Sequence, residues 1–345
     1  MTIFVFEHLV GGGACDEELP AALADAGAAM WRAVTEDFSA AGHEVLTCAG
    51  RRTDTTRGGK AMATIAPPAE LAEVMAAAER CDAALIIAPE TGGVSLGWAR
   101  QIAGWRARSL GSSPNAIELC SDKFALCTHL AHCGIAVPST IAGEPARLLT
   151  AGCLGLNGGN SWILKPRDGA GCERTFLVRD PIQFAQLREQ LDVDDLAAPT
   201  SPHDGWILQP FHVGQPASVS FMVHGSSVMP LRAGAQLIDV GNELTYRGGE
   251  IPLAEDLARR AIALAEKAVD SVPGLRGFVG VDLVLGDGPE SDVVIEINPR
   301  VTMSYCGLRR LCGVNLASMM LDPKLEPSWR AGRVRFDNTG RVEEH

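Results

Sequence analysis

The chain lacks the sequence features that mark several common classes of protein. Its 345 residues contain no apolar run near the ~20 residues that a membrane-spanning helix needs. The ten cysteines include no Cys-x-x-Cys pair, which disfavours a zinc site and is typical of reduced thiols in a cytoplasmic protein. The net charge of −12 disfavours a general nucleic-acid binder and a protein of anionic membrane surfaces.

Two familiar glycine motifs for nucleotides are missing as well. No Gly-x-x-x-x-Gly-Lys-Ser/Thr segment occurs, and the glycine triplet at 11–13 does not fit the dinucleotide pattern Gly-x-Gly-x-x-Gly. Residues 1–7 have no basic segment and no cleavable apolar stretch, so they predict a first strand instead of a secretion signal. We therefore expect a cytoplasmic protein.

The most informative segment is a predicted buried strand, Val293–Asn298, because it carries one acidic residue among apolar ones. Side chains alternate along a strand, so Glu296 and Asn298 face the same side. A second predicted strand, at 280–285, carries Asp282 inside an apolar run. Antiparallel pairing of these strands would bring the three polar side chains together, and hard oxygen ligands of this kind suit Mg²⁺. A chance carboxylate in a strand is the alternative, but an unpaired buried carboxylate is energetically expensive.

A lysine at the end of a strand, followed by a glycine-rich loop, predicts a second ligand-binding segment upstream. Residues 161–165 form the predicted strand, which ends at Lys165, and the loop Asp168-Gly169-Ala170-Gly171 follows. Glycines allow backbone N–H groups to turn toward phosphate oxygens, and the lysine adds a positive charge. A structural hairpin without a ligand is the alternative interpretation.

Together, these motifs resemble those of the ATP-grasp superfamily of carboxylate–amine ligases. The resemblance implies that the chain binds ATP with Mg²⁺ or Mn²⁺, and that its partners are a small-molecule carboxylate and an amine, not nucleic acid or membrane. Family members carry a lysine at the start of a helix that reaches the nucleotide phosphates. Lys123 matches this position, in a helix that we expect to begin with Ser121 as its N-cap. The implied nucleotide-binding residues are Lys123, Lys165, Asp168, Gly169, Gly171, Gln209, Phe211, Val213 and Gln215.

The hinge between the two superfamily lobes is the source of four of these assignments. Gln209, Phe211 and Val213 follow a predicted strand from Trp206, where relatives contact adenine through the backbone. Gln215 stands where relatives often carry an acidic ribose ligand. Whether Gln215 contacts the ribose is left open.

The resemblance also implies a metal site and a catalytic cation. Asp282, Glu296 and Asn298 are the implied metal ligands. Several peptide-type ligases of the superfamily carry an arginine two residues before the metal-binding Asp, where this chain has Gly280. Arg300 is therefore the implied catalytic residue, which would meet the γ-phosphate or an acyl phosphate with its planar pair of donors.

A narrower resemblance concerns the substrates. The segments 6–8, 88–91, 110–113 and 296–305 together are similar to those of tyramine–L-glutamate ligases of methanofuran biosynthesis, which implies an amide joining glutamate to tyramine. Another amino-acid or dipeptide ligase of the superfamily is an alternative, and so is a non-catalytic nucleotide-binding regulatory protein. The candidates for substrate recognition are Glu90, Tyr305 and Arg309.

The order of predicted elements indicates an α/β protein. Apolar strands at 3–6, 43–47 and 82–88 alternate with predicted helices at 19–41 and 68–80. This order is typical of a parallel sheet that helices cover on both faces.

The superfamily resemblance implies the domain boundaries. A pre-ATP-grasp α/β domain would occupy residues 1–118, followed by a two-lobed ATP-grasp fold. The N-terminal lobe, at 119–215, would carry the glycine-rich loop, and the C-terminal lobe, at 216–325, would carry the metal site. Residues 326–345 are expected to form a polar, partly loose tail. A long glycine-containing connection at 234–249 would close over the substrate, and a homodimer is left open.

Overall fold

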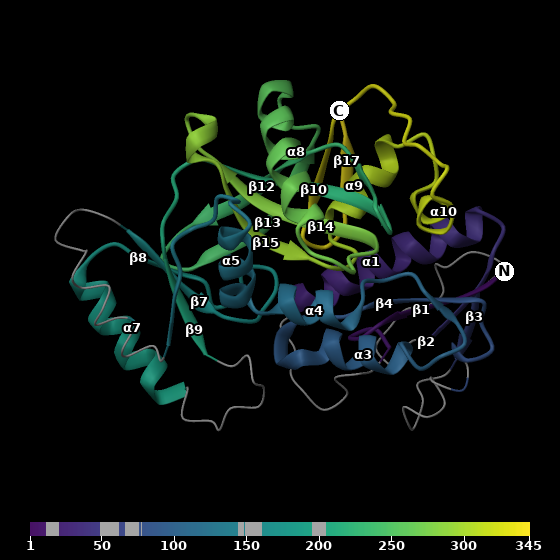
Figure 1. Cartoon of the computed structure of the whole chain (residues 1–345), viewed down its shortest axis with the longest axis horizontal. Coiled ribbons are helices and arrows are strands. Elements are labelled where there is room, and N and C mark those ends of the chain that lie inside the picture. Colours follow the sequence, from purple (N-terminus) through teal and green to yellow (C-terminus); the bar gives the residue numbers. More distant parts are fainter. Residues whose placement is uncertain are drawn as a thin grey trace.

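The computed structural model describes residues 1–11, 21–48, 62–65, 76, 78–143, 148, 161–194 and 205–345, and the account below concerns these residues. Their strands form three sheets. Figure 1 shows the first sheet at lower right, the second at left, and the third between and above them. Within this described part, no helix is long and apolar enough to cross a membrane.

The first sheet is parallel and has the strand order β3-β2-β1-β4-β5. Ile3 and Val5 on one face of β1 belong to the core that includes helix α1, whereas Phe4 and Phe6 on the other face pack with Trp98 of helix α3. Alternate side chains of a buried strand thus serve two covering layers. The elements are β1 (Thr2–Glu7), α1 (Ala21–Ala40), β2 (Glu44–Cys48), β3 (Met62–Ile65), β4 (Ala83–Ile87), η1 (Thr91–Gly93), α3 (Val94–Ile102) and β5 (Arg108–Ser109).

The expected strands and first helix of this region are confirmed. Helix α3 was not predicted from the sequence. The helix expected at 68–80 lies outside the described residues, apart from residues 76 and 78–80.

Two short helices connect the first sheet to the rest of the chain. They are α4 (Pro114–Ser121) and α5 (Lys123–His132). The expected N-cap of α5 is wrong by one residue, because Ser121 ends α4 and the Asp122 carboxylate accepts hydrogen bonds from the N–H groups of Phe124 and Ala125. An aspartate caps a helix at least as well as a serine, so the correction follows ordinary capping chemistry.

The second sheet is antiparallel, with the order β6-β9-β7-β8, and has a hydrophobic core of its own. Leu164, Leu208 and Trp206 from the sheet pack with Phe184 and Leu187 of helix α7 in that core. The predicted strand before the glycine-rich loop is confirmed as β7, and β8 follows the loop and pairs with β7. The elements are β6 (Ile141–Gly143), β7 (Trp162–Pro166), β8 (Phe176–Val178), α7 (Pro181–Asp194) and β9 (Trp206–Pro210).

The third sheet is antiparallel, with the order β15-β14-β10-β12-β13-β16-β17, and β11 pairs with β10. Helix α8 packs on β14, β10 and β15, and α9 packs on β13 and β16. The elements are β10 (Gln215–His224), β11 (Ser227–Pro230), β12 (Gly234–Val240), β13 (Leu244–Ile251), α8 (Glu255–Asp270), β14 (Gly277–Leu285), η2 (Pro289–Ser291), β15 (Val293–Asn298), α9 (Ser304–Leu311), α10 (Leu316–Leu321), β16 (Val334–Asp337) and β17 (Val342–Glu344).

Two sequence expectations for this region are wrong. The connection expected at 234–249 is a hairpin of β12 and β13. Apolar and polar residues do not alternate clearly along these partly buried strands, so the sequence did not predict them. The tail expected at 326–345 is not loose, because β16 pairs with β13 and buries Val334 and Phe336. Those two apolar residues alternate with Arg333 and Arg335, which is a strand signal.

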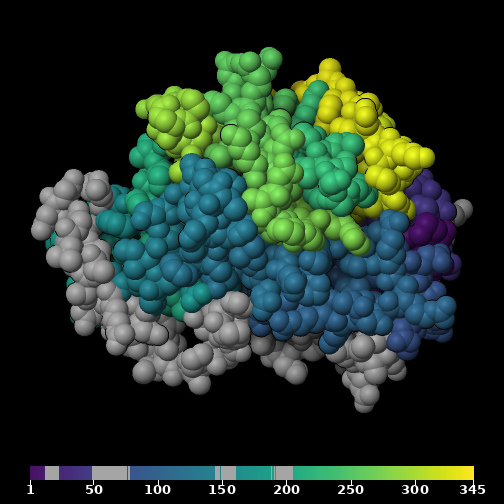
Figure 2. Space-filling view, in the orientation of Figure 1, coloured from purple at the N-terminus to yellow at the C-terminus, as the bar shows by residue number. Residues whose placement is uncertain are grey.

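The first and third sheets share one hydrophobic core, unlike the second sheet. Helix α1 packs against β1 on one side and against α9 and α10 on the other. In the space-filling view the yellow C-terminal residues accordingly lie against the purple N-terminal ones at the right (Figure 2). The cavity described next lies between this self-contained second sheet and the larger composite body.

Candidate nucleotide and metal site

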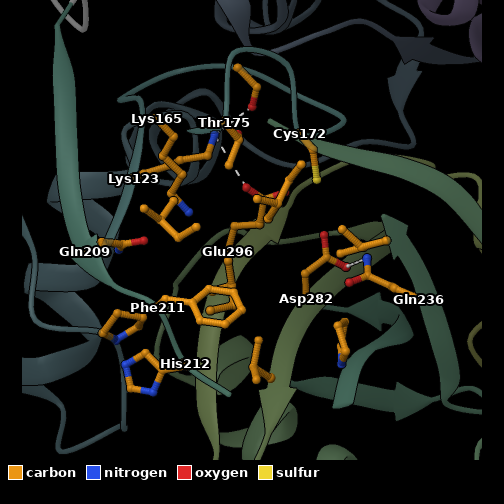
Figure 3. A pocket seen from close by; sticks show the side chains of 18 of the residues that line it. Lys123, Lys165, Cys172, Thr175, Gln209, Phe211, His212, Gln236, Asp282 and Glu296 are labelled. Carbon is orange, nitrogen blue, oxygen red and sulfur yellow. Dashed lines mark hydrogen bonds and ion pairs between the residues drawn. The ribbon is translucent and has the colours of Figure 1, made fainter. Parts of the chain in front are cut away.

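A cavity of about 370 Å³ lies between the second and third sheets. Its walls come from β7, the glycine-rich loop, the chain after β9, β12, and the paired strands β14 and β15. A volume of this size is within the range of small-molecule sites. Figure 3 shows Lys123 and Lys165 together on one side, Asp282 with Gln236 on the other, and Glu296 between them.

The carboxylates converge because β14 and β15 are paired antiparallel, as the sequence predicted. Asp282 lies directly opposite Glu296, next to an irregularity in the strand pairing. Asn298 Nδ2 donates to Asp282 Oδ2 at 3.1 Å and to Glu296 Oε1 at 3.4 Å. From β12, which is separated from β14 by β10, Gln236 Nε2 donates to Asp282 Oδ1 at 2.9 Å. Two amide side chains therefore hold the carboxylate pair at the cavity wall.

Two lysines form the opposite wall. Lys123 Nζ lies 3.4 Å from Glu296 Oε2 and donates to the Gly169 carbonyl at 2.6 Å. Lys165 is 6% exposed. Burial lowers the pKa of Lys165 and Lys123 lowers it further, although Glu296 opposes both effects. The chain has only five lysines, so two of them in one buried wall is a marked concentration of charge.

The two carboxylates respond differently to this surrounding. Burial, and then the neighbouring charge of Glu296, raise the pKa of Asp282 well above its usual range. Burial alone would raise the pKa of Glu296 too, but Lys123 and Lys165 outweigh it and lower that pKa. The cavity therefore has a cationic end, where two lysines face Glu296, and an acidic end at Asp282, where the charge of Arg300 offsets only part of the effect of burial and of Glu296.

This donor set fits a hard divalent cation. Asp282 and Glu296 are like charges side by side and partly buried, an arrangement that is unfavourable unless a cation joins them. Within the described residues, no group of three His, Cys, Asp or Glu side chains could hold a metal ion. A carboxylate pair completed by substrate phosphates is how Mg²⁺ is commonly bound. Asn298 is not among the cavity-lining residues of the described chain and acts here as a donor to the pair.

The glycine-rich loop forms the roof beside the lysines. Gly169 and Gly171 line the cavity and have φ angles of +133° and +68°, a region that favours glycine. Asp168, expected to bind nucleotide, also lines the cavity, but its Oδ2 accepts a 2.8 Å hydrogen bond from the Gly92 N–H of the first domain. Cys172, which the sequence analysis missed, lines the cavity directly after these glycines.

The hinge residues divide into two groups. Gln209 and Phe211 line the cavity, and Gln209 Nε2 donates to Thr140 Oγ1 at 2.9 Å. The Val213 side chain is 81% exposed, and the Gln215 Nε2 donates to the Pro216 carbonyl at 2.8 Å instead of lining the cavity. His212 and Gln236 are among the further lining residues that the sequence analysis missed. His212 adjoins a predicted residue, whereas Gln236 was hidden because β12 was expected to be a connection.

Arg300 and Glu90 meet outside the cavity. Arg300 Nε donates to Glu90 Oε1 at 2.8 Å, and Arg300 Nη2 donates to Glu90 Oε2 at 2.7 Å. The side chains are 12% and 5% exposed. Two residues that are far apart in the sequence and were predicted to take part in different steps thus form one buried, bidentate ion pair.

The structure places Tyr305 and Arg309, the candidates for substrate recognition, outside this cavity. Tyr305 is fully buried against Phe278, and its hydroxyl donates to Asp37 Oδ2 at 2.8 Å. Arg309 Nη2 donates to Asp37 Oδ1 at 2.6 Å and Nη1 to Glu36 Oε2 at 3.1 Å. Helix α9 turns both side chains toward α1, away from the cavity.

Comparison with known proteins agrees with this geometry. The tyramine–L-glutamate ligase of Methanocaldococcus fervens is 28% identical over 231 residues, which are 67% of this chain and 62% of that protein. An ATP-grasp superfamily protein from Archaeoglobus fulgidus, solved by crystallography, has a TM-score of 0.70 and 25% identity and covers 97% of this chain and 92% of its own.

Agreement in fold extends to more distant proteins. The ADP complex of N5-carboxyaminoimidazole ribonucleotide synthetase has a TM-score of 0.71 at 13% identity and covers 97% of this chain and 80% of its own. A family model for the pre ATP-grasp 3 domain matches residues 43–117. The family model for the ATP-grasp domain matches residues 120–304, more than half of the chain. The chain therefore belongs to the ATP-grasp family.

Proposed function

We propose that this protein is an ATP-dependent ligase that joins a carboxylate to an amine. The observation that carries the proposal is the cavity in which Lys123 and Lys165 face the carboxylate pair of Asp282 and Glu296. Cations at one end suit nucleotide phosphates, and carboxylates at the other suit a metal that binds the same phosphates. The family match and the named relative support the same activity, although the chain spans only about three fifths of that relative's length.

The proposed reaction has two balanced steps. A substrate carboxylate oxygen attacks the γ-phosphorus of ATP, the bond from that phosphorus to ADP breaks, and an acyl phosphate forms. The uncharged amine then attacks the acyl carbon, the carbon–oxygen bond to phosphate breaks, and the amide, phosphate and a proton are released. Activation as an acyl phosphate replaces a poor leaving group by a good one, as in other covalent strategies.

The residues of this proposal act in the first step, phosphoryl transfer. Lys123 and Lys165 hold the phosphates, and Glu296 keeps Lys123 in place. Asp282 and Glu296 would hold Mg²⁺, which supplies charge neutralisation on the transferring phosphoryl group. Arg300 stabilises the charge that develops on that group, because its guanidinium offers donors in a fixed plane.

The substrates are proposed from similarity. The relative is named for tyramine and L-glutamate, so we propose that this chain joins glutamate to tyramine in a methanofuran-type synthesis. The domain boundaries proposed for this reaction are 1–118, 119–215 and 216–325, with β16 and β17 added to the last. Dependence on ATP favours the cytoplasm as its place of action.

The proposal is tested by ADP release. The purified chain with ATP and Mg²⁺ should release ADP only when L-glutamate and an amine are both added, with tyramine the best of a panel that also contains phenethylamine, ammonia and amino acids. Mass spectrometry of the product should give the matching amide. An amino acid as best amine would favour a dipeptide ligase, and ATP binding without substrate-dependent ADP release would favour a regulatory protein.

A further inference from the structure

One short segment of the first domain contacts both parts of the proposed catalytic machinery. This segment, residues 89–93, follows β4 and is named here the bridge segment. Its Glu90 binds Arg300 of the third sheet, and its Gly92 N–H donates to Asp168 of the glycine-rich loop. Parallel strands present their carboxyl ends at one edge, so the bridge segment lies where a first-domain ligand would bind.

The Glu90 contact fixes the orientation of Arg300. A guanidinium has five N–H donors. Within the described residues, hydrogen bonds account for three of them, two to Glu90 and one from Nη1 to the Val301 carbonyl. The two donors bonded to Glu90, on Nε and Nη2, lie along one edge of the planar guanidinium. One N–H on each terminal nitrogen is then left for another ligand. A buried bidentate partner thus aims the remaining donors without using them.

The Asp168 contact fixes the glycine-rich loop in the same way. Asp168 is 9% exposed, so its carboxylate is largely withdrawn from water. Gly92 and Gly93 have φ angles of +64° and +70°, which allow the chain to turn sharply before α3 begins at Val94. An anion at the start of a helix is also favoured by the helix dipole.

We propose that the bridge segment positions Arg300 and the glycine-rich loop together, with Glu90 and Asp168 as positioning residues instead of ligands of substrate and nucleotide. The inference rests on the proposed ligase function for its kinetic part. As a consequence, the first domain controls the geometry of phosphoryl transfer through the contacts of Glu90 with Arg300 and of Gly92 with Asp168.

The kinetic test uses Glu90→Gln, alone and with Arg300→Lys. Glu90→Gln should lower kcat roughly 10–100-fold, the usual loss when a supporting partner is removed, with unchanged KM for glutamate and tyramine and unchanged affinity for ATP. The double variant should fall no further than Arg300→Lys does alone, since Glu90 acts through Arg300. The assignment would be overturned if the fold-losses in kcat of the two single variants multiplied in the double variant. A raised KM for either substrate with kcat intact would overturn it as well.

Controls separate this outcome from a folding defect. Glu118→Gln breaks an exposed ion pair with Arg100 and should leave kcat unchanged. If Glu90→Gln does not fold, Glu90→Asp takes its place, because it keeps the charge while it shortens the arm that holds Arg300, and it should lower kcat without raising KM.

The second test needs only nucleotide, so it decides the Asp168 contact even if the proposed ligase function fails. Hydrogen exchange of the glycine-rich loop, measured with ADP and Mg²⁺ bound, should be faster in Asp168→Ala than in the unmodified chain. Asp168→Asn keeps an oxygen that accepts from Gly92 N–H and should retain the original rate. Equal exchange in all three proteins, or equally fast exchange in both variants, would contradict the proposal.

Discussion

Two buried groups of charged side chains in this molecule differ in how completely their charges are matched. In the cavity, Asp282 lies beside Glu296, and Lys123 lies near Lys165, so like charges adjoin one another. Between α1 and α9, the buried Asp37 carboxylate is matched by a hydroxyl and a guanidinium, and the more exposed Glu36 carboxylate contacts the same guanidinium. Like charges held together in a partly buried wall repel one another and cost folding energy, whereas the opposite charges of the Asp37 group attract.

This difference separates a site from a structural contact. The cavity group lines an opening of about 370 Å³, and the charge of Arg300 only partly offsets the burial of Asp282 beside Glu296. The Asp37 group joins the first sheet to the third, and although Asp37 and Arg309 also line a second cavity, the carboxylate there already has a protein cation. An arrangement that disfavours folding is maintained when a ligand supplies what is missing, in keeping with the clustering of perturbed pKa values at functional sites. Substitutions in the two groups should therefore have different effects on activity and on stability.

The largest effect is expected from Asp282→Asn. Turnover should fall roughly 10³-fold, because a metal clamp contributes several kcal/mol to transition-state stabilisation. In EDTA without nucleotide, the melting temperature should stay the same or rise, since the change removes one of two adjacent like charges. Kinetics and thermal unfolding measure the two quantities. Asp287→Asn, at an exposed position beyond the same strand, is the control, and a fall in melting temperature with turnover kept would make Asp282 structural.

Arg300→Lys comes next. Lysine keeps the charge but loses the planar pair of donors, so kcat should fall roughly 10²–10³-fold, the usual cost of one lost transition-state donor. The KM for ATP should move little, because Arg300 does not line the cavity. Steady-state kinetics decide the point, with Arg310→Lys on the exposed side of α9 as the control. A raised KM for ATP at normal kcat would make Arg300 a ground-state binding residue.

Loss of either cavity lysine should weaken nucleotide binding by a smaller amount. Lys165→Ala and Lys123→Ala each remove a charge-assisted contact to phosphate, which contributes about 1.5–3 kcal/mol and corresponds to roughly 10–100-fold in Kd. Calorimetry with ATP and Mg²⁺ measures the change, and Lys267→Ala on the exposed face of α8 should cause none. Unchanged affinity for ATP in both cavity variants would show that the nucleotide does not bind in this cavity.

The smallest effect is expected in the Asp37 group. Tyr305→Phe removes one hydrogen bond to a carboxylate that Arg309 still holds. The free energy of unfolding, measured in urea, should therefore fall by about 1–2 kcal/mol, while kcat and KM stay the same. The comparison depends on this separation of stability from activity. A changed KM for glutamate or tyramine at unchanged stability would return Tyr305 to the substrate site.

Local patterns in the sequence predicted the carboxylate strands but not their surroundings. Alternation along β14 and β15 places Asp282, Glu296 and Asn298 on one side, and this needs no knowledge of the rest of the chain. Gln236 was beyond reach, since β12 shows no clear alternation. The pairing of Glu90 with Arg300 was equally hidden, because it joins separate sheets. Contacts of that kind depend on how domains pack, which no local period encodes.

The burial of Tyr305 could have been predicted from the sequence. Tyr305, Leu308 and Leu311 recur at helical spacing in α9, and all three are buried. The resemblance to tyramine–L-glutamate ligases suggested a site residue, but the helix period indicated a core residue. The period was the better guide, because burial of an apolar helix face determines how the helix lies.

Transfer of an oxygen atom from substrate to phosphate tests the central claim most directly. L-glutamate labelled with oxygen-18 in its carboxylates, together with ATP, Mg²⁺ and tyramine, should yield inorganic phosphate that carries an oxygen-18 atom for each amide formed. That result requires the carboxylate oxygen to have bonded to the γ-phosphorus. Amide formation with unlabelled phosphate, or ADP release without amide, would contradict an acyl-phosphate ligase.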